Sequence, residues 1–356
     1  MLFMVLFYFC INNENEEIVI SNEPIDVSDV KPEWQWFYYN QKISMIGYNK
    51  DAWKSDDFKS TGVSIFYSKR YDMCIKRKVT IALIDSSINL VSDYVKSNIW
   101  YNMGEFPNDK IDNDQNGYVD DVFGWDFYDE KSCIQSEKGS THATSIANLI
   151  CGNGKIHGIV QNEECKLMNL KVTDEMSGNG NTDKLIEAID YAEKNGAQIC
   201  CISLNWENEA EVYKHILNSK MLFVVSAGND GNCINDNQIN YFGLKNVISV
   251  ADLRCDGKLS QTSNYGMSID IAALGTDILC LDNEEKGRFL SGTSFATPLV
   301  AGTAALIYQN CKKELQAEEI KRIIISNVTV SEELRHKVAS SGYLNFQKSL
   351  EDVCEN

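Results

Sequence analysis

The sequence has few basic residues, few prolines and no long hydrophobic run. Its 33 lysines and arginines stand against 51 acidic residues, which gives a formal charge of -18 and a pI near 4.7. A field of that sign repels phosphate backbones and anionic lipid surfaces, so we expect no nucleic-acid partner. With 4 prolines against 22 glycines, the composition excludes collagen-like and disordered chains and is typical of a globular protein.

An apolar run opens the chain, from Met1 to Ile11, but it is far shorter than the roughly 20 residues that a membrane-spanning helix requires. We therefore expect no membrane span. The run has the length of a signal-peptide core, yet it lacks a basic start and a small-residue cleavage site. Two alternatives stay open: a signal, which predicts a secreted or cell-envelope protein, and a buried or disordered terminus, which predicts a cytoplasmic one.

The 12 cysteines are scattered and form no CxxC pair, which argues against a metal or redox framework. Cys200 and Cys201 are neighbours in a strand-like run, where adjacent side chains point to opposite faces. We expect buried thiols rather than a network of disulfides.

Strand-like and helical patterns alternate from residue 79 onward, which predicts crossover units on a parallel sheet. We expect one catalytic-sized domain at residues 31–356, preceded by an N-terminal extension at residues 1–30 that is a signal or a short pro-segment. The predicted elements are Val79–Ile84, Thr141–Cys151, Lys166–Val172, Asp183–Asn195, Gln198–Leu204, Met221–Ser226, Val247–Asp252, Ser294–Gln309 and Ala317–Ser326.

Three polar residues have the types that nucleophilic catalysis needs. Asp85 follows an apolar strand-like run, His142 opens a helical pattern in Gly139-Ser-Thr-His-Ala-Thr-Ser-Ile-Ala147, and Ser294 opens another in Ser291-Gly-Thr-Ser-Phe-Ala-Thr-Pro298. Taken alone, each is compatible with a helix cap or another structural role. Together they supply a hydroxyl, an imidazole that takes its proton and a carboxylate that orients the imidazole.

Asn229 adds a fourth component. It lies in Val224-Val-Ser-Ala-Gly-Asn-Asp-Gly231, again beyond an apolar run. Its side-chain amide is a suitable donor for the oxyanion that develops when a hydroxyl attacks a carbonyl. Four such signals in one chain outweigh their separate structural interpretations.

In the order Asp, His, Asn, Ser, these segments resemble the subtilisin-like serine proteases, the subtilases, over nearly all of residues 30–350. The block Gly292-Thr-Ser-Phe-Ala-Thr-Pro298 fits the family pattern at every position. The resemblance implies a three-layer α/β fold with a central, mostly parallel sheet flanked by helices. It also implies a serine endopeptidase with the triad Asp85, His142 and Ser294, with Asn229 in the oxyanion hole and no cofactor for catalysis.

The resemblance also implies the substrate and its site. An extended polypeptide would add as a strand to an edge formed by Ser203, Leu204 and Asn205. The further substrate-binding residues implied are Ser226, Ala227 and Gly228. We expect the protein to act as a monomer.

The chain departs from the family pattern at several positions. Ser87 and Ala143 replace glycines that follow the aspartate and the histidine, Asn148 replaces a later glycine, and Leu274 replaces a usual proline. Because a misplacement of about 1 Å can cost 10²-fold in rate, a weak or inactive peptide-binding protein on the same fold is the alternative. An esterase with similar machinery is a third interpretation.

Other hydrolase classes fit less well. The sedolisins use a Glu/Asp pair in place of His142 and an aspartate in place of Asn229. The sequence contains no GxSxG elbow of an α/β-hydrolase and no HExxH motif of a zinc protease. The short stretch before residue 31 predicts a short extension rather than a full folding pro-domain, which favours a specialised processing protease.

The acidic loop Asp112-Asn-Asp-Gln-Asn-Gly-Tyr-Val-Asp-Asp121 has oxygen ligands at positions 1, 3 and 5 and a glycine at position 6, as calcium loops do. Phe123 stands where an EF-hand has its closing glutamate, so Asp120 or Asp121 would have to complete the shell. Subtilases often carry calcium in this stretch, and the alternative is a hydrated acidic loop. The expected ligands of a structural Ca²⁺ are Asp112, Asp114, Asn116, Tyr118, Asp120 and Asp121.

Overall fold

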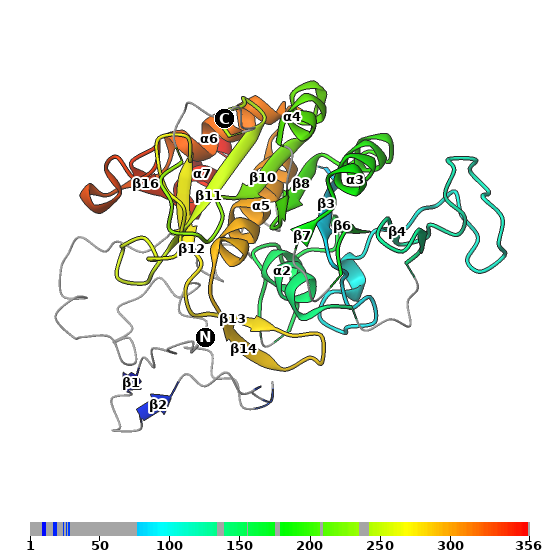
Figure 1. Cartoon of the computed structure of the whole chain (residues 1–356), viewed down its shortest axis with the longest axis horizontal. Helices are drawn as coiled ribbons and strands as arrows, with labels where there is room; N and C mark the ends of the chain where they lie inside the picture. Colours follow the sequence, from blue (N-terminus) through cyan, green and yellow to red (C-terminus); the bar gives the residue numbers. More distant parts are fainter. Residues whose placement is uncertain are drawn as a thin grey trace.

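The computed structural model describes residues 9–11, 17–19, 24, 26, 28, 77–133, 139–154, 156–174, 179–206, 209–234 and 242–354 (Figure 1). Most of the predicted extension at residues 1–30, including most of the run Met1–Ile11, and the predicted domain start at residue 31 lie outside these ranges. In the N-terminal part, β1 (Phe9–Ile11) pairs antiparallel with β2 (Glu17–Val19).

A 10-stranded sheet forms the centre of the molecule, in the order β15-β16-β12-β11-β10-β8-β3-β6-β4-β5. Its central strands run parallel: β6 (Cys165–Lys171), β3 (Val79–Asp85), β8 (Ile199–Ile202), β10 (Leu222–Ser226), β11 (Val247–Leu253) and β12 (Ile271–Leu274). Towards the edges lie β4 (Gly124–Asp126) and β16 (Gly342–Tyr343), which pair antiparallel with the edge strands β5 (Lys131–Ser132) and β15 (Thr329–Val330). The carboxyl ends of the central strands therefore meet at one edge of the sheet, where functional groups gather in such folds.

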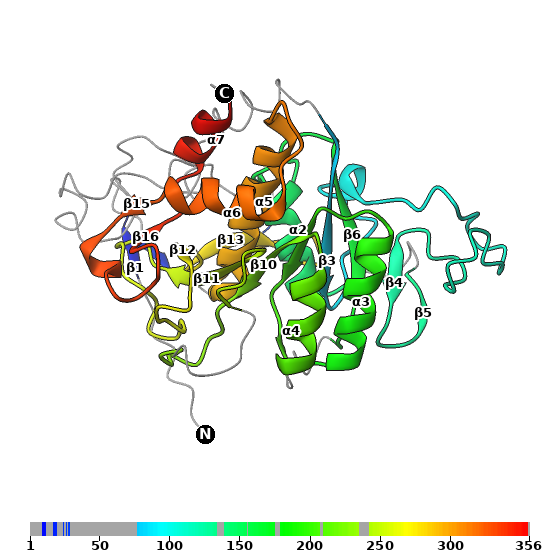
Figure 2. The ribbon, with the colours of Figure 1, turned by 90° about the horizontal axis from the view of Figure 1, so that it is seen from above.

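Helices cover both faces of this sheet (Figure 2). On one face lie α2 (Thr141–Cys151), α5 (Thr293–Asn310), α6 (Ala317–Ser326) and α7 (Phe346–Cys354), and on the other lie α3 (Thr182–Lys194) and α4 (Glu209–Asn218). Successive side chains of β3 point to opposite faces of the sheet, so this strand contributes to the hydrophobic core on each face. Ile81 and Leu83 pack under the first group of helices, and Ala82 and Ile84 pack under the second. The predicted three-layer α/β fold is confirmed.

Helix α5 is buried along its whole length of 18 residues. Its sequence is apolar or small on every side, which is typical of a helix surrounded by protein. Pro298 is the sixth residue of α5, and because it has no N–H the backbone oxygen of Ser294 lacks its usual helical donor. The burial fixes the start of α5 against the sheet.

Shorter elements complete the described part. They are the hairpin of β13 (Ile278–Leu281) and β14 (Gly287–Leu290), the parallel pair β7 (Asn179–Gly180) and β9 (Asn205–Trp206), and the 3₁₀ turns η4 (Lys96–Asn98) and η5 (Glu332–Leu334). Cys200 and Cys201 are buried thiols within β8. Of the helices in these ranges, none combines the length and the apolar character needed to cross a membrane.

Candidate active site

Asp85 and His142 meet at the carboxyl edge of the sheet. Asp85 is the last residue of β3, and His142 is the second residue of α2, whose N-cap Ser140 accepts a hydrogen bond from the backbone N–H of Ala143. The imidazole Nδ1 lies 2.9 Å from Asp85 Oδ1 and 3.1 Å from Oδ2. Because Nδ1 faces the carboxylate, Nε2 is left to act on another group.

The surroundings of this pair favour a charged imidazole. Asp85 is only 2% exposed, and its Oδ1 also accepts hydrogen bonds from the backbone N–H and the hydroxyl of Ser86, at 2.7 and 3.0 Å. Burial lowers the pKa of His142, but the charge and the hydrogen bond of Asp85 outweigh burial and raise that pKa above its ordinary value. The pair is therefore suited to accept a proton and hold it.

Ser294 is the second residue of α5, and its neighbour Phe295 contacts this pair. The ring of His142 packs edge-on against Phe295, the next residue, with 5.7 Å between ring centroids. The Ser294 hydroxyl donates a hydrogen bond to the backbone oxygen of Ser203 at 3.2 Å. In the described part of the chain, no hydrogen bond joins this hydroxyl to His142. The structure thus pairs the predicted aspartate with the predicted histidine and places the predicted serine next in sequence to a residue that contacts that histidine.

A glycine turn places the start of α5. Gly292 has a φ of +145°, a conformation that other residues rarely adopt. Its backbone N–H donates to the oxygen of Gly275 at 2.9 Å. A Cβ atom here would lie 3.4 Å from Asn229 Oδ1, so glycine also allows the chain to pass close to that side chain.

Asn229 is fixed from two sides. Its Oδ1 accepts hydrogen bonds from the backbone N–H and the hydroxyl of Thr293, at 2.9 and 3.1 Å, so its Nδ2 group points away from Thr293. Asn264, which sequence analysis did not single out, holds the loop around it. Asn264 Nδ2 donates to the oxygen of Ala227 at 3.0 Å, and its Oδ1 accepts from the backbone N–H of Asp230 at 3.2 Å.

The predicted substrate segments follow β8 and β10. Ser203 and Leu204 are buried just beyond β8. Asn205 lies in β9 and pairs with Asn179 of β7, so one backbone edge of this segment already has a partner. A peptide strand would have to use the other edge or displace β7. The second segment ends β10, with Ser226 and Ala227 buried, and continues into Gly228, which has a φ of +96°.

A model of the subtilase family matches residues 76–346. The chain belongs to the subtilase family. Subtilisin-like protease 1 of Plasmodium falciparum (isolate 3D7) is 27% identical to it over 300 residues, which cover 76% of this chain and 43% of that protein. Thermitase of Thermoactinomyces vulgaris is 32% identical over 192 residues, which cover 52% of this chain and 67% of thermitase. This subtilase therefore spans less than half the length of the Plasmodium relative.

Solved structures share the fold. The prenylagaramide maturation protease PagA superposes with a TM-score of 0.61 at 22% identity, over 80% of this chain and 98% of that one. The epidermin leader peptide processing serine protease EpiP of Staphylococcus aureus also gives 0.61, at 21% identity, over 80% of this chain and 77% of that one. At this level of identity, the likeness concerns the fold.

Two of the departures of this subtilase from the family pattern, Ser87 and Ala143, are compatible with the paired aspartate and histidine. The backbone oxygen of Ser87 accepts a hydrogen bond from the N–H of Ser140 at 2.8 Å, and Ala143 is fully buried. Both substitutions coexist with the short contact between Asp85 and the imidazole. Asn148 is buried as well, and its Oδ1 has no hydrogen-bond partner among the described residues, whereas Leu274 is buried at the end of β12.

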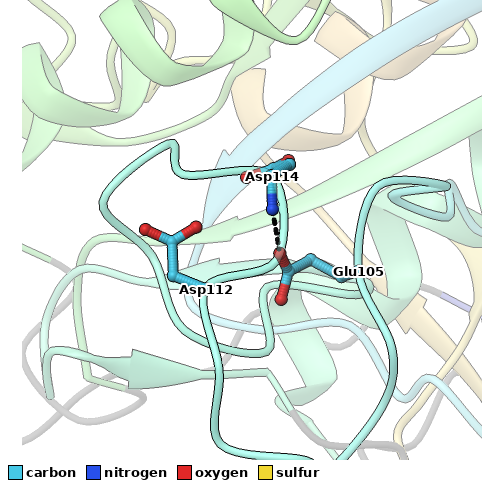
Figure 3. Close-up of side chains that lie close together, drawn as sticks. All are labelled: Glu105, Asp112 and Asp114. Carbon is cyan, nitrogen blue, oxygen red and sulfur yellow. Dashed lines mark hydrogen bonds between the residues drawn. The ribbon is translucent and has the colours of Figure 1, made fainter.

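Three carboxylates come together at the predicted calcium loop (Figure 3). The ligand oxygens of Glu105, Asp112 and Asp114 all lie within 4.8 Å of one another. Glu105 accepts a hydrogen bond from the backbone N–H of Asp114 at 3.1 Å, and Asp112 accepts one from that of Asn116 at 3.0 Å. A set of hard, charged oxygens fits Ca²⁺. Glu105 precedes the predicted loop and was missed in the sequence.

The predicted calcium ligands Asp120, Asp121 and Tyr118 lie outside this group of three carboxylates. The carboxylate of Asp120 accepts a hydrogen bond from the backbone N–H of Lys110 at 3.1 Å and is not part of the group of three. Asp121 is fully buried and accepts a hydrogen bond from the hydroxyl of Tyr191. The ring of Tyr118 packs edge-on against that of Tyr191. Glu105, rather than Asp120 or Asp121, is the third carboxylate beside Asp112 and Asp114.

Proposed function

We propose that this subtilase is a serine endopeptidase with Ser294 as its nucleophile, His142 as its general base and Asp85 as the residue that orients the imidazole. The observation that carries this proposal is the 2.9 Å contact between His142 Nδ1 and Asp85 Oδ1, beside the start of α5. The family match and the relatives named as proteases support hydrolysis of peptide bonds.

The chemistry follows from the positions of these groups. Nε2 of His142 takes the proton as the Ser294 oxygen attacks the scissile carbonyl, and the imidazolium then protonates the leaving amine. Asp85 stabilises that imidazolium. The Nδ2 group of Asn229 and the backbone N–H of Ser294 would receive the oxyanion, where a single donor is worth about 10²–10³ in rate. Water then cleaves the acyl-enzyme with His142 again as the base.

The proposed substrate is an extended polypeptide. It would contact the segments Ser203–Asn205 and Ser226–Gly228 through its backbone. We also propose that the enzyme acts as a specialised processing protease. The names of PagA and EpiP, a maturation protease and a leader peptide processing protease, support this narrower role.

We also propose a structural Ca²⁺ held by Glu105, Asp112 and Asp114. Oxygen ligands from three carboxylates support it. The ion would hold the loop and takes no part in the reaction.

A serine-directed fluorophosphonate probe tests the proposed activity. Mass spectrometry should find the label on Ser294 of the wild type and none on Ser294→Ala, with and without calcium. Peptide hydrolysis should be lost in the same variant. Absence of labelling in folded, calcium-loaded wild type would favour the peptide-binding alternative, and ester turnover without peptide cleavage would favour an esterase.

A further inference from the structure

The turn between β13 and β14 touches the beginning of α2. Asn283, in this turn, donates a hydrogen bond from Nδ2 to the backbone oxygen of Gly139 at 2.9 Å. Its Oδ1 accepts one from the hydroxyl of Thr141 at 2.9 Å. One carboxamide therefore holds the residue before and the residue after the N-cap Ser140, and Thr141 directly precedes His142.

This contact matters because the first turn of a helix is its least constrained part. The first four backbone N–H groups have no partners within the helix, and helix ends fray. His142 is the second residue of α2, so the position of its imidazole depends on that turn. The cap from Ser140 satisfies one N–H group, and Ser140 also contacts Ser86 and Ser87 beyond β3, so the residues on either side of it are the ones left for the hairpin to hold.

The turn that carries Asn283 is itself rigid. Asp282 is fully buried, and its Oδ1 accepts hydrogen bonds from the backbone N–H groups of Glu284 and Lys286, at 2.9 and 2.8 Å. Its Oδ2 accepts one from Nε of Arg288 at 2.6 Å. The turn can therefore serve as a fixed support for α2.

The same hairpin leads into the other half of the site. Strand β14 ends at Leu290, and Ser294 follows within a few residues. A further hydrogen bond joins the hairpin to α2, from the hydroxyl of Ser145 to the backbone oxygen of Leu281 at 2.8 Å. The hairpin is thus bonded to the helix of His142 and continuous in sequence with the helix of Ser294 (Figure 1).

We propose that Asn283 is a positioning residue, which fixes the imidazole of His142 relative to the hydroxyl of Ser294 by holding Gly139 and Thr141. This inference rests on the proposed endopeptidase function. A carboxamide suits the task because it donates and accepts at once, whereas an aspartate would lose the donor and a leucine would lose both. A shift of the imidazole by about 1 Å is enough to cost 10²-fold in rate.

Three variants test the proposal at different points of contact. Asn283→Ala removes both hydrogen bonds, Asn283→Asp keeps only the acceptor for Thr141, and Thr141→Val removes one donor without a change of shape. We expect Asn283→Ala to lower kcat for peptide hydrolysis about 10–100-fold with KM within about twofold. The rate of fluorophosphonate labelling at Ser294 should fall in parallel, and the two other variants should lie between Asn283→Ala and wild type.

The matched control is Glu284→Ala, the exposed neighbour in the same turn, whose side chain pairs with Lys286. It should keep the wild-type kcat and labelling rate. All rates are measured well below each variant's melting temperature, so that a merely structural role would lower the melting temperature and leave the rate of the folded enzyme unchanged. Should Asn283→Ala fail to fold, Thr141→Val and Asn283→Asp give the answer.

The outcomes separate the two proposals. Wild-type kcat and labelling in folded Asn283→Ala, or in both conservative variants, would overturn the positioning role while the endopeptidase function stands. Peptide hydrolysis that persists at the wild-type level in Ser294→Ala and His142→Ala would overturn the proposed endopeptidase function. The positioning role of Asn283 would then fall with it. A double-mutant cycle of Asn283→Ala and Thr141→Val should be non-additive, because both changes remove the same contact.

Discussion

Ser203 and Ser294 form a reciprocal pair, in which each hydroxyl donates a hydrogen bond to the backbone oxygen of the other at 3.2 Å. One half of this pair has a cause in the sequence. The backbone oxygen of Ser294 would normally accept from the N–H four residues later, but Pro298 stands there and has no N–H. The Ser203 hydroxyl supplies the missing donor.

Ser203→Ala should therefore destabilise the protein by about 1–3 kcal/mol, because a buried carbonyl loses its donor. Urea denaturation measures the change. Pro298→Ala is the matched second change, since it restores an N–H at the right place in α5. The cost of Ser203→Ala should shrink in the Pro298→Ala background, and an equal cost in both backgrounds would contradict this explanation.

Asp85→Asn should change both the rate and its pH dependence. In the proposed mechanism the neutral imidazole is the base, so activity rises as pH passes the pKa of His142, which Asp85 raises. Without the carboxylate, burial lowers that pKa, and the acid limb of the profile should move to lower pH. We expect kcat to fall on the order of 10⁴-fold, as for a lost triad aspartate.

Profiles of kcat/KM against pH for wild type and Asp85→Asn check this. An unchanged acid limb in the variant would show that another group controls it. His215 also faces an aspartate, with Nδ1 3.1 Å from Asp190 Oδ1. Asp190→Asn is therefore a matched control for the removal of a histidine's acidic partner, and it should leave the profile unchanged.

Calcium should raise the melting temperature of chelator-stripped protein by several degrees. A ligand that binds only the folded state at 100 times its Kd contributes about 2.7 kcal/mol of stability. Glu105→Gln and Asp112→Asn should each reduce the shift, because each removes a charged oxygen from the group of three. Asp93→Asn, an exposed change elsewhere, is the control. A shift that survives in Glu105→Gln and Asp112→Asn would place the ion at another site.

Much of the fold could be predicted because the buried parallel strands are continuous apolar runs. The run predicted at Met221–Ser226 is β10, one residue shorter, and the helix predicted at Thr141–Cys151 is α2. The hairpin of β13 and β14 was not predicted. Its turn is held by the side chain of Asp282.

The candidate site, like the fold, has parts that the sequence pattern predicts and parts that it does not. Asp85, His142 and Ser294 each stand at the end of a strand or the start of a helix, so local pattern was enough to find them. Asn283 meets Thr141 across 142 positions of sequence, and only the folded chain reveals that contact. The hydrogen bonds of Asn264 to the Asn229 loop likewise depend on the tertiary structure.

Asp252 should make the stability of the protein depend on pH. It is fully buried in β11, and burial raises its pKa from 3.8 to about 7, assisted by the charge of Asp277 and opposed by hydrogen bonds from Thr276 and Ser260 and by Arg254. The folded state therefore keeps a proton that the unfolded chain releases above pH 4. The stabilisation from this proton is complete below about pH 4 and is lost as pH rises to about 7.

The loss amounts to about 4 kcal/mol, because a tenfold difference in proton affinity between the folded and unfolded states corresponds to about 1.4 kcal/mol. Asp252→Asn removes the titrating group but retains an oxygen that can accept from Thr276. Urea denaturation of wild type and variant at pH 5 and pH 8 isolates the contribution of Asp252, because the other titrating groups are common to both proteins. Stability should fall less between the two pH values in the variant. An equal fall in both proteins would mean that the Asp252 carboxyl group is already ionised at pH 5 in the folded state.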